Sequence, residues 1–330
     1  MVNLRVFTLI ALLLTLISCT DITEHEMAFK AGLHIISSED FSTIKTITDM
    51  VGARCLLIYP GNVFVASTEG TILRYDSESL ELLEEYPVAA PSPAGFSDMV
   101  FSSLEGTAYL IGSLGIILEI NLPDCTVLDE FSVCQSPMKL ALGPGSEYLF
   151  VADGPSNKIY QVLIGNNKPY DSVSIYYTIK CMEPSQNPDS MLVGTSDGLC
   201  LIEILSPSTI RYVVWGLQKA YMALAAVPDD SIFVGVTRNS VGIFDLFVPL
   251  TEPPTPNFYG GVSIEGNTDF IAMGHDWQHA YVLSYLGDNT SRLVSYNYRF
   301  HTISQEVEIP GYPLDLEVSG NGVIYALTTE

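Results

Sequence analysis

Two of the chain's five histidines lie within four residues of each other, in His275-Asp276-Trp277-Gln278-His279. On a helix this spacing would place both imidazoles on one face, where they could bind a metal ion. The segment falls where a turn between two strands is expected, and a turn does not align the two rings. We therefore predict an exposed turn, with no metal site and no cofactor.

Other catalytic patterns are missing from the sequence. There is no GxSxG segment, no glycine-rich phosphate loop and no histidine–cysteine pairing of recognisable spacing. Paired carboxylates could perform acid–base chemistry only if they converge in space, which a sequence does not show. The sequence thus names no catalytic residue and favours a protein that is not an enzyme.

The cysteines are interpreted as buried thiols with one exception. Cys125 and Cys134 stand at opposite ends of one expected strand, about 30 Å apart at 3.3 Å per residue, so they cannot form a disulfide. Cys181 and Cys200 fall on strands that a third strand should separate. None of these spacings suggests zinc or haem.

The exception is Cys19, which follows an apolar stretch near the N-terminus. Arg5 precedes the apolar segment 6–17, which has the length of a signal-peptide core rather than a membrane span. Leu16-Ile17-Ser18-Cys19 resembles the bacterial lipobox. That resemblance implies cleavage before Cys19 and lipid attachment to its sulfur, a membrane anchor that acyl chains make durable. Thr20 follows the cysteine, which implies the outer membrane if the cell is Gram-negative.

The elements that must position any site repeat along the chain. Short apolar strands with an aromatic residue or leucine at their centre recur 41 to 48 residues apart. Their central residues are Phe64, Tyr109, Phe150, Leu192, Phe233, Tyr281 and Tyr325. A repeat of about 40–45 residues built from short strands is typical of a β-propeller blade, with one four-stranded sheet per repeat.

Each repeat carries the same order of strands and turns. An inner strand such as 139–142 is followed by a turn rich in Pro, Gly, Asn and Asp, then by the apolar strand, a polar loop, an alternating third strand and an exposed fourth strand. The segment 144–153 (PGSEYLFVAD) resembles the SPDGxxLYVAN segment of YVTN/YncE-like propeller repeats, and 75–81 (YDSESLE) is similar to their following hairpin. The resemblance extends over nearly all of 31–330 and implies a propeller without specifying a subgroup.

The last repeat is two strands short, since the chain ends five residues after Tyr325. The segment 33–48 is similar to the third and fourth strands of the other repeats. We therefore predict an all-β, seven-bladed propeller whose last blade pairs 33–48 with 313–329, which removes the open edges of the array. The predicted organisation is a signal peptide (1–18), a tether (19–30) and one propeller domain (31–330).

A binding site is expected on the face that carries the second-to-third-strand loops and the blade-to-blade linkers. Arg238 is singled out there because cations are scarce, and it could hold an anion. Candidate binding residues on this face are Glu69, Asp153, Asn157, Asp197, Trp215, Arg238 and Asp288. The proline-rich segment 249–258 is expected to form an exposed loop between a third and a fourth strand.

Composition limits the partners. The net charge is −24, from 38 acidic and 14 basic residues, so a basic stripe for nucleic acid cannot be assembled. The leading hypothesis is a lipid-anchored, non-enzymatic scaffold of the bacterial cell envelope that binds a protein or glycan through its loop faces. The alternatives are a propeller enzyme of lactonase or lyase type with its site in the axial channel, and an accessory subunit of an envelope assembly machine.

Overall fold

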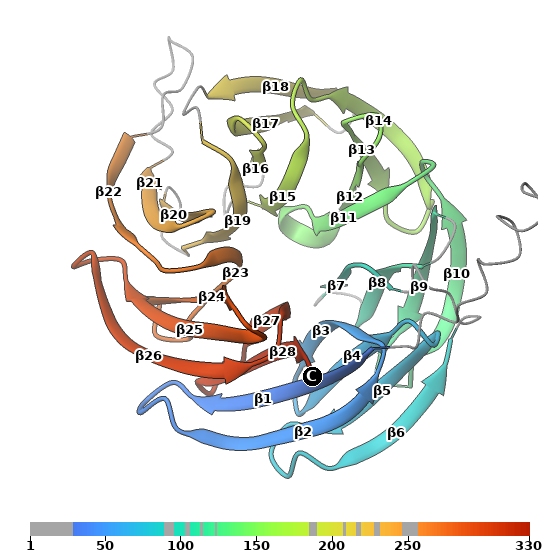
Figure 1. The fold of residues 1–330 in the computed structure, drawn as a ribbon. Helices are drawn as coiled ribbons and strands as arrows, with labels where there is room; N and C mark the ends of the chain where they lie inside the picture. The colour runs from blue at the N-terminus through green and yellow to red at the C-terminus, as the bar shows by residue number, and fades with distance from the viewer. Residues whose placement is uncertain are drawn as a thin grey trace, which may run out of the picture.

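Seven four-stranded antiparallel sheets surround a central axis in the computed structural model, confirming the seven-bladed β-propeller (Figure 1). The structure describes residues 29–88, 96–102, 106–112, 115–122, 124–184, 190–206, 209–215, 219–227, 232–245 and 257–330. Within these ranges it describes the backbone alone for 144, 204–206, 209–215, 244–245 and 257–259.

The blades follow the chain in order, from the innermost strand outward. Blades 1 to 3 consist of β3 (Ala53–Tyr59), β4 (Asn62–Ser67), β5 (Thr71–Asp76) and β6 (Leu82–Pro87); β7 (Met99–Ser102), β8 (Thr107–Ile111), β9 (Ile116–Asn121) and β10 (Thr126–Ser132); and β11 (Pro137–Leu142), β12 (Tyr148–Asp153), β13 (Lys158–Leu163) and β14 (Lys168–Ser174). Blades 4 to 6 consist of β15 (Ile179–Pro184), β16 (Ser190–Thr195), β17 (Gly198–Ser206) and β18 (Thr209–Trp215); β19 (Tyr221–Ala226), β20 (Ile232–Thr237), β21 (Ser240–Asp245) and β22 (Asn257–Ser263); and β23 (Asn267–Met273), β24 (His279–Gly287), β25 (Thr290–Asn297) and β26 (Thr302–Pro310). A 3₁₀ turn, η2 (Pro144–Ser146), joins β11 to β12.

Blade 7 closes the ring as expected. Its strand order is β2-β1-β28-β27, formed by β27 (Pro313–Val318) and β28 (Val323–Thr329) from the C-terminus and by β1 (Lys30–Ser37) and β2 (Thr43–Val51) from the N-terminus. β1 pairs with β28 from Ala31↔Thr329 to Ser37↔Val323. Because β1 starts at Lys30, the last residue of the predicted tether belongs to the blade.

The second strand of each blade is apolar because it is packed on both sides. β4, β8 and β16 are buried along their whole length between two neighbouring blades, whereas the outer strands β6 and β10 are mostly exposed. Six of the seven central residues found in the sequence pack toward the following blade. Phe233 packs toward the preceding blade, against Leu192 and Leu201.

The reason is a register difference in blade 5. Phe150 of blade 3 lies opposite Ala141 on the inner strand. The residue of blade 5 equivalent to Ala141 is Ala225, but Phe233 lies opposite the next residue, Ala226. Val234, opposite Ala225, is therefore the structural equivalent of Phe150, and the sequence-based alignment of this repeat is wrong by one residue. A shift of one residue in a strand exchanges the two faces of the sheet.

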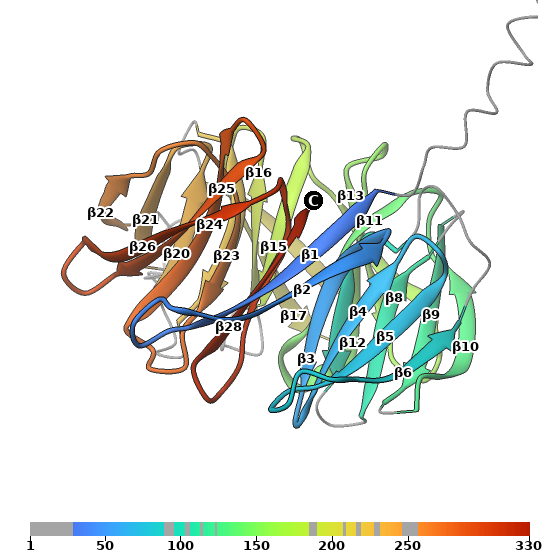
Figure 2. The same ribbon diagram turned by 60° about the horizontal axis from the view of Figure 1, so that its bottom comes forward.

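The propeller has two distinct faces, which Figure 2 shows from the side. One face, here called the turn face, carries the turns between first and second strands, such as β3–β4 and β27–β28. The other, the linker face, carries the second-to-third-strand loops and the blade-to-blade connections. Inner strands begin at the linker face, which is turned toward the viewer in Figure 1, and β1 begins there as well.

The cysteine interpretation is confirmed for the described residues. Cys55, Cys125, Cys181 and Cys200 are buried free thiols, and Cys134 is a partly buried one. Burial raises the pKa of Cys125, Cys134 and Cys181 to about 12. β16 separates the strands of Cys181 and Cys200.

Two further sequence features bear on the termini and on the insertion. The segment 249–258 lies between β21 and β22, a third and a fourth strand, but positions 246–256 are outside the described residues. Cys19 and the whole predicted leader are outside them too. Across the ranges given above, no helix has the length and apolar character needed to cross a bilayer.

Closure predicts a sharp difference between two residues of blade 7. Leu33 is fully buried against the core of blades 7 and 1, and Ile44 is 53% exposed on the outer strand. Leu33→Ala should lower the free energy of unfolding by about 2–5 kcal/mol because it leaves a cavity. Ile44→Ala should change it by about 0.5 kcal/mol or less. Urea unfolding followed by circular dichroism measures both; equal losses would contradict a stabilising role for β1 in closure.

Candidate functional site

The inner strands place two layers of residues around the axis, and their pairing with the second strands shows which residues are equivalent in the seven blades. We call the layer nearer the linker face the staple layer; in each inner strand its residue comes two positions before the residue of the other layer. It consists of Cys55, Asp98, Lys139, Cys181, Ala223, Phe270 and Asp315. The second, called the pocket layer, consists of Leu57, Val100, Ala141, Glu183, Ala225, Ala272 and Glu317. Two residues along a strand separate the layers by about 7 Å.

Carboxylates in both layers connect neighbouring blades. Asp98 Oδ2 accepts a hydrogen bond of 2.6 Å from the backbone N–H of Leu140 in the next blade. Asp315 Oδ2 accepts one of 2.6 Å from Leu56 N–H, across the closure between blades 7 and 1. An inner strand has no strand partner on its axial edge, so its N–H groups need other acceptors. These carboxylates supply them.

Lys139 gives the staple layer its cation. Its Nζ lies 3.2 Å from Asp98 Oδ1. The charge of Asp98 is the main reason that the pKa of Lys139 is raised. The pKa of Asp315 is raised to about 6, chiefly by burial. The channel thus contains a charged group made of Asp98, Lys139 and Asp315. Its carboxylates hold neighbouring blades together.

A cavity of about 600 Å³ opens from the pocket layer toward the turn face. It exists because three of the seven positions in this layer are alanine, which leaves the axis unfilled. The described residues that line it are Phe101, Leu142, Gly143, Gly145, Ser146, Glu183, Pro184, Leu224, Ala225, Ala226, Ile271, Ala272, Met273, Trp277, Leu316, Glu317 and Val318. We call this cavity the axial pocket.

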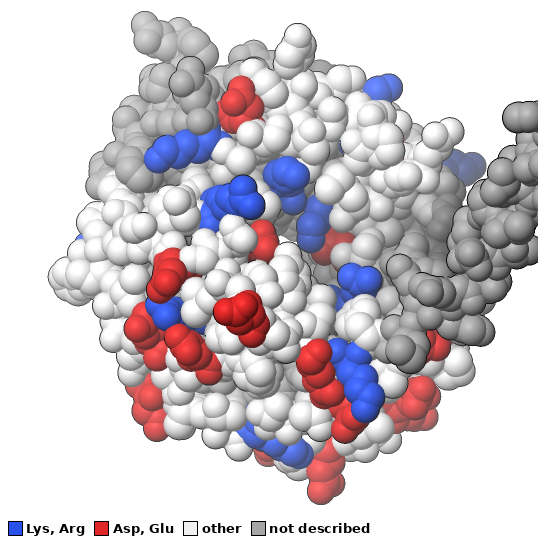
Figure 3. Space-filling model, in the orientation of Figure 1, with Lys and Arg blue, Asp and Glu red and all other residues white. Residues whose placement is uncertain are grey.

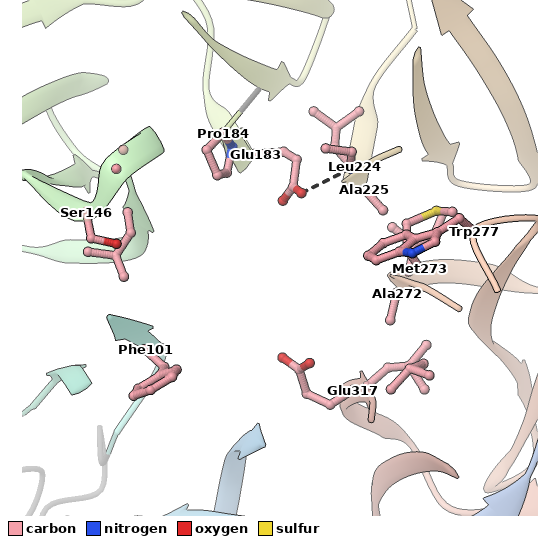
Figure 4. A pocket seen from close by; sticks show the side chains of 17 residues that line it. Phe101, Ser146, Glu183, Pro184, Leu224, Ala225, Ala272, Met273, Trp277 and Glu317 are labelled. Atoms are coloured by element: carbon pink, nitrogen blue, oxygen red, sulfur yellow. Dashed lines mark hydrogen bonds between the residues drawn. The ribbon is translucent and has the colours of Figure 1, made fainter. Parts of the chain in front are cut away.

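Glu183 and Glu317 occupy the same position in blades 4 and 7, so they face one another across the axial pocket (Figure 4). Glu183 Oε1 accepts a hydrogen bond of 3.0 Å from Ala226 N–H in the next blade. No hydrogen bond to the Glu317 carboxyl occurs within the described part of the chain, although it is the equivalent residue. Glu183 therefore links blades 4 and 5 through one of its oxygens, whereas Glu317 projects into the pocket without such a link among the described residues.

The protonation of both glutamates is shifted by their surroundings. Burial raises the pKa of Glu183 to about 7. Burial, with the charges of Asp315, Glu183 and Asp98 next in importance, raises the pKa of Glu317 to about 8. Water still reaches both side chains, which are half-buried. The axial pocket therefore contains carboxyl groups that gain and lose protons near neutral pH.

The candidate residues from the sequence lie at the other end of the molecule. Glu69, Asp197, Arg238 and Asp288 are exposed in second-to-third-strand loops of four different blades. The ring therefore spreads them apart, and none lines the axial pocket. Figure 3 shows that Lys and Arg side chains gather around the central opening on this linker face.

The remaining candidates have identifiable local roles. Asp153 is 5% exposed, and its carboxylate accepts hydrogen bonds from Ser136 N–H at 3.1 Å and from the Ser156 hydroxyl. Asn157 adopts a left-handed conformation with φ of 50°, which asparagine tolerates in such a loop. Arg238 Nε donates to Asn267 Oδ1 at 2.8 Å. Trp215 ends β18, the outer strand of blade 4, rather than lying in a linker.

The histidine segment forms the β23–β24 turn, as the repeat predicts. His279 Nδ1 donates to Asp276 Oδ2 at 2.5 Å, and His279 Nε2 accepts from Asn297 Nδ2 at 3.1 Å. Both ring nitrogens are thus used to hold the turn against β25. This turn also borders a second cavity of about 400 Å³. In the ranges that the structure describes, no three His, Cys, Asp or Glu side chains are placed to hold a metal ion.

Comparison with known proteins identifies the fold and nothing finer. No family model matches the sequence, and no curated protein matches it. A functionally unknown protein from Desulfotomaculum acetoxidans is similar in structure, with a TM-score of 0.71, 12% identity, and coverage of 84% of this chain and 95% of that one. Similar too are the β-propeller domain of Cps50 (Swd1) from Myceliophteria thermophila (TM-score 0.65, 11% identity, 83% and 96% covered) and hydrazine synthase from Kuenenia stuttgartiensis (TM-score 0.61, 13% identity, 84% and 95% covered).

The raised pKa values predict how stability depends on pH. Each of these carboxyls binds its proton more tightly in the folded than in the unfolded chain. The free energy of unfolding should therefore fall as the pH rises from the ordinary value of 4.5 for Glu317 toward its folded value of about 8. The slope per carboxyl should reach at most about 1.4 kcal/mol per pH unit.

Glu317→Gln should reduce this slope, because glutamine is neutral at every pH. Glu130→Gln, on the exposed outer strand of blade 2, is the matched control and should leave the slope unchanged. Urea unfolding at pH 5, 6, 7 and 8 measures the effect. If the free energy of unfolding of the wild type rises over this range, the pKa values of the channel carboxyls are not raised in the folded protein.

Proposed function

We propose that this protein is a lipid-anchored, non-enzymatic binding protein of the bacterial cell envelope, and that its ligand occupies the axial pocket. The observation that carries the proposal is the pocket itself. At about 600 Å³ it has the size of a small-molecule site, and its lining combines apolar side chains such as Phe101, Met273 and Trp277 with two carboxyl groups. The ligand could be a chemical group on the surface of a protein or glycan partner that enters the pocket.

The position of β1 supports the anchored arrangement. β1 begins at Lys30 on the linker face, eleven residues after Cys19, whereas the axial pocket opens on the turn face. A tether of eleven residues spans at most about 40 Å. A lipid on Cys19 would hold the linker face toward the membrane and leave the pocket mouth on the side away from it. The resemblance to YVTN/YncE-like repeats fits the same proposal of an exported propeller.

A second candidate function is catalysis in the channel, favoured by one observation. Glu317 and Glu183, with pKa values raised to about 8 and about 7, face each other as a general acid and base would. Such an enzyme would be of the lactonase or lyase type. The two functions differ in the fate of the ligand: a binding protein returns it unchanged, whereas an enzyme returns a product whose formation requires both glutamates.

The anchor has a direct test. Growth of the bacterial host on labelled palmitate should label the protein, and Cys19→Ala should abolish the label and release the protein from the membrane fraction. Cys134→Ala, at a partly buried cysteine of the propeller, should keep both the label and the membrane location. A Cys19→Ala protein that still carries palmitate would refute the anchor.

Ligand binding can be followed through Trp277, which lines the pocket and is 49% exposed. The chain has two tryptophans, so Trp215→Phe leaves Trp277 as the only tryptophan, whose emission is separated from that of the tyrosines by selective excitation. A small-molecule fraction from the host envelope should change its emission, because a ligand displaces water from the indole. Filling the pocket with Ala272→Phe should remove the response while the variant stays folded. No response to any fraction would contradict a ligand in the axial pocket.

A further inference from the structure

We propose that the ligand of the axial pocket is an organic cation, with an ammonium or guanidinium group on an apolar body. This inference rests on the proposed function and names the chemical class that the site selects. The cation would lie between Glu183 and Glu317, and its apolar body would extend toward the turn face.

The charge of the pocket supports this assignment. Among its described lining residues the ionisable groups are two carboxyls from opposite blades, without a lysine, arginine or histidine beside them. Lys139 lies one layer deeper, where it is bound to Asp98. A cation entering from the turn face thus meets the Glu317 carboxyl, which no described residue hydrogen-bonds, and the Glu183 carboxyl, one oxygen of which accepts from Ala226 N–H. A carboxylate ligand would meet like charge as soon as these carboxyls ionise.

The walls fit the apolar part of such a ligand. Phe101 and Trp277 lie on opposite sides of the cavity, with Met273 and Leu224 also lining it (Figure 4). Tyr59 from the neighbouring blade packs edge-on against Phe101, with ring centroids 5.1 Å apart. Tyr298 donates its hydroxyl to the Trp277 carbonyl at 2.5 Å, which holds that turn in place. Aromatic faces attract cations as well as apolar groups, so these walls suit both parts of the ligand.

The glutamates also couple binding to protonation. Besides each other, they are surrounded by Asp315 on the strand of Glu317, by Asp98 in blade 2 and by Lys139 in blade 3, the last two paired. At neutral pH Glu317 is largely protonated and Glu183 partly so, because their pKa values are raised to about 8 and about 7. An ammonium or guanidinium group favours the ionised carboxyls, so its binding should release protons. Its affinity should rise between pH 6 and pH 8.

Calorimetry with the full chain in detergent tests the class of ligand. The probe is 2-phenylethylamine, compared with two molecules of similar shape, the neutral 2-phenylethanol and the anionic 3-phenylpropionate. The amine should bind at least about ten-fold more tightly than either, a difference that one charge-assisted hydrogen bond can supply. Titration in two buffers of different ionisation enthalpy should show proton release. Equal or tighter binding of the alcohol or the acid would overturn the proposal.

Matched variants locate the effect. Glu317→Gln and Glu183→Gln should each weaken amine binding about ten-fold, and Glu317→Gln should also flatten the pH dependence. Glu130→Gln, far from the pocket on β10, should change neither. Thermal unfolding confirms that each variant is folded; we expect Glu317→Gln to be no less stable than the wild type, since it removes a charge that burial disfavours. Unchanged amine affinity in both glutamate variants would place the amine elsewhere and refute the site.

The cation could belong to a free metabolite or to a basic side chain of a partner protein. Nα-acetyl-lysine-N-methylamide presents the second form, and its norleucine counterpart is the neutral control. Tighter binding of the lysine derivative than of 2-phenylethylamine would support a partner's side chain, and the reverse order a free amine. If amines fail while an envelope fraction still changes Trp277 emission, the assignment of a cation is wrong and the binding function stands. If both fail, the proposed function is wrong as well.

Discussion

The structure depends on how the axial edge of each inner strand is satisfied. In a propeller the inner strand has a neighbour on its outer side and none on its axial side, so backbone N–H groups face a narrow channel. Asp98, Asp315 and Glu183 accept three of these N–H groups, each from the blade that follows. A charged acceptor makes a stronger hydrogen bond than a neutral one. The same bonds that join the blades therefore place carboxyl groups at the axis.

Glu183 and Glu317 show how one repeat position can serve two purposes. They stand at equivalent places in blades 4 and 7, and of the two only Glu183 accepts a hydrogen bond from the adjacent inner strand in the described part of the chain. Alanines at three other positions of the same layer keep the axis open between them. Framework and pocket thus share their residues. The Glu317 carboxyl is not used to link two blades, so under our proposal a ligand can bind it. Burying this group with few partners costs free energy.

The channel is also asymmetric from one face to the other. Several Lys and Arg side chains lie beside the opening on the linker face, while the pocket on the turn face contains two glutamates. The difference occurs in a chain whose net charge is −24. The two openings should therefore attract ions of opposite sign. Since β1 begins on the linker face, an anchor at Cys19 would attach to the molecule on that side, opposite the mouth of the axial pocket.

The seven-bladed fold, its closure by the N-terminal strands and the separation of the cysteines followed from the sequence alone. The spacing of the apolar strands and the alternation of apolar and polar residues within them depend on which residues each blade buries. Every blade buries the same positions, so the pattern repeats along the sequence. One residue of register, at Phe233, was assigned wrongly because Phe233 and Val234 are both apolar and both buried. The axial pocket was not found, although its signal was present: charged residues interrupt largely apolar inner strands at Lys139, Lys180, Glu183, Asp315 and Glu317. Only the closed ring decides that Glu183 and Glu317, 134 positions apart in the numbering, face each other, because that contact depends on blade count and layer rather than on any local pattern.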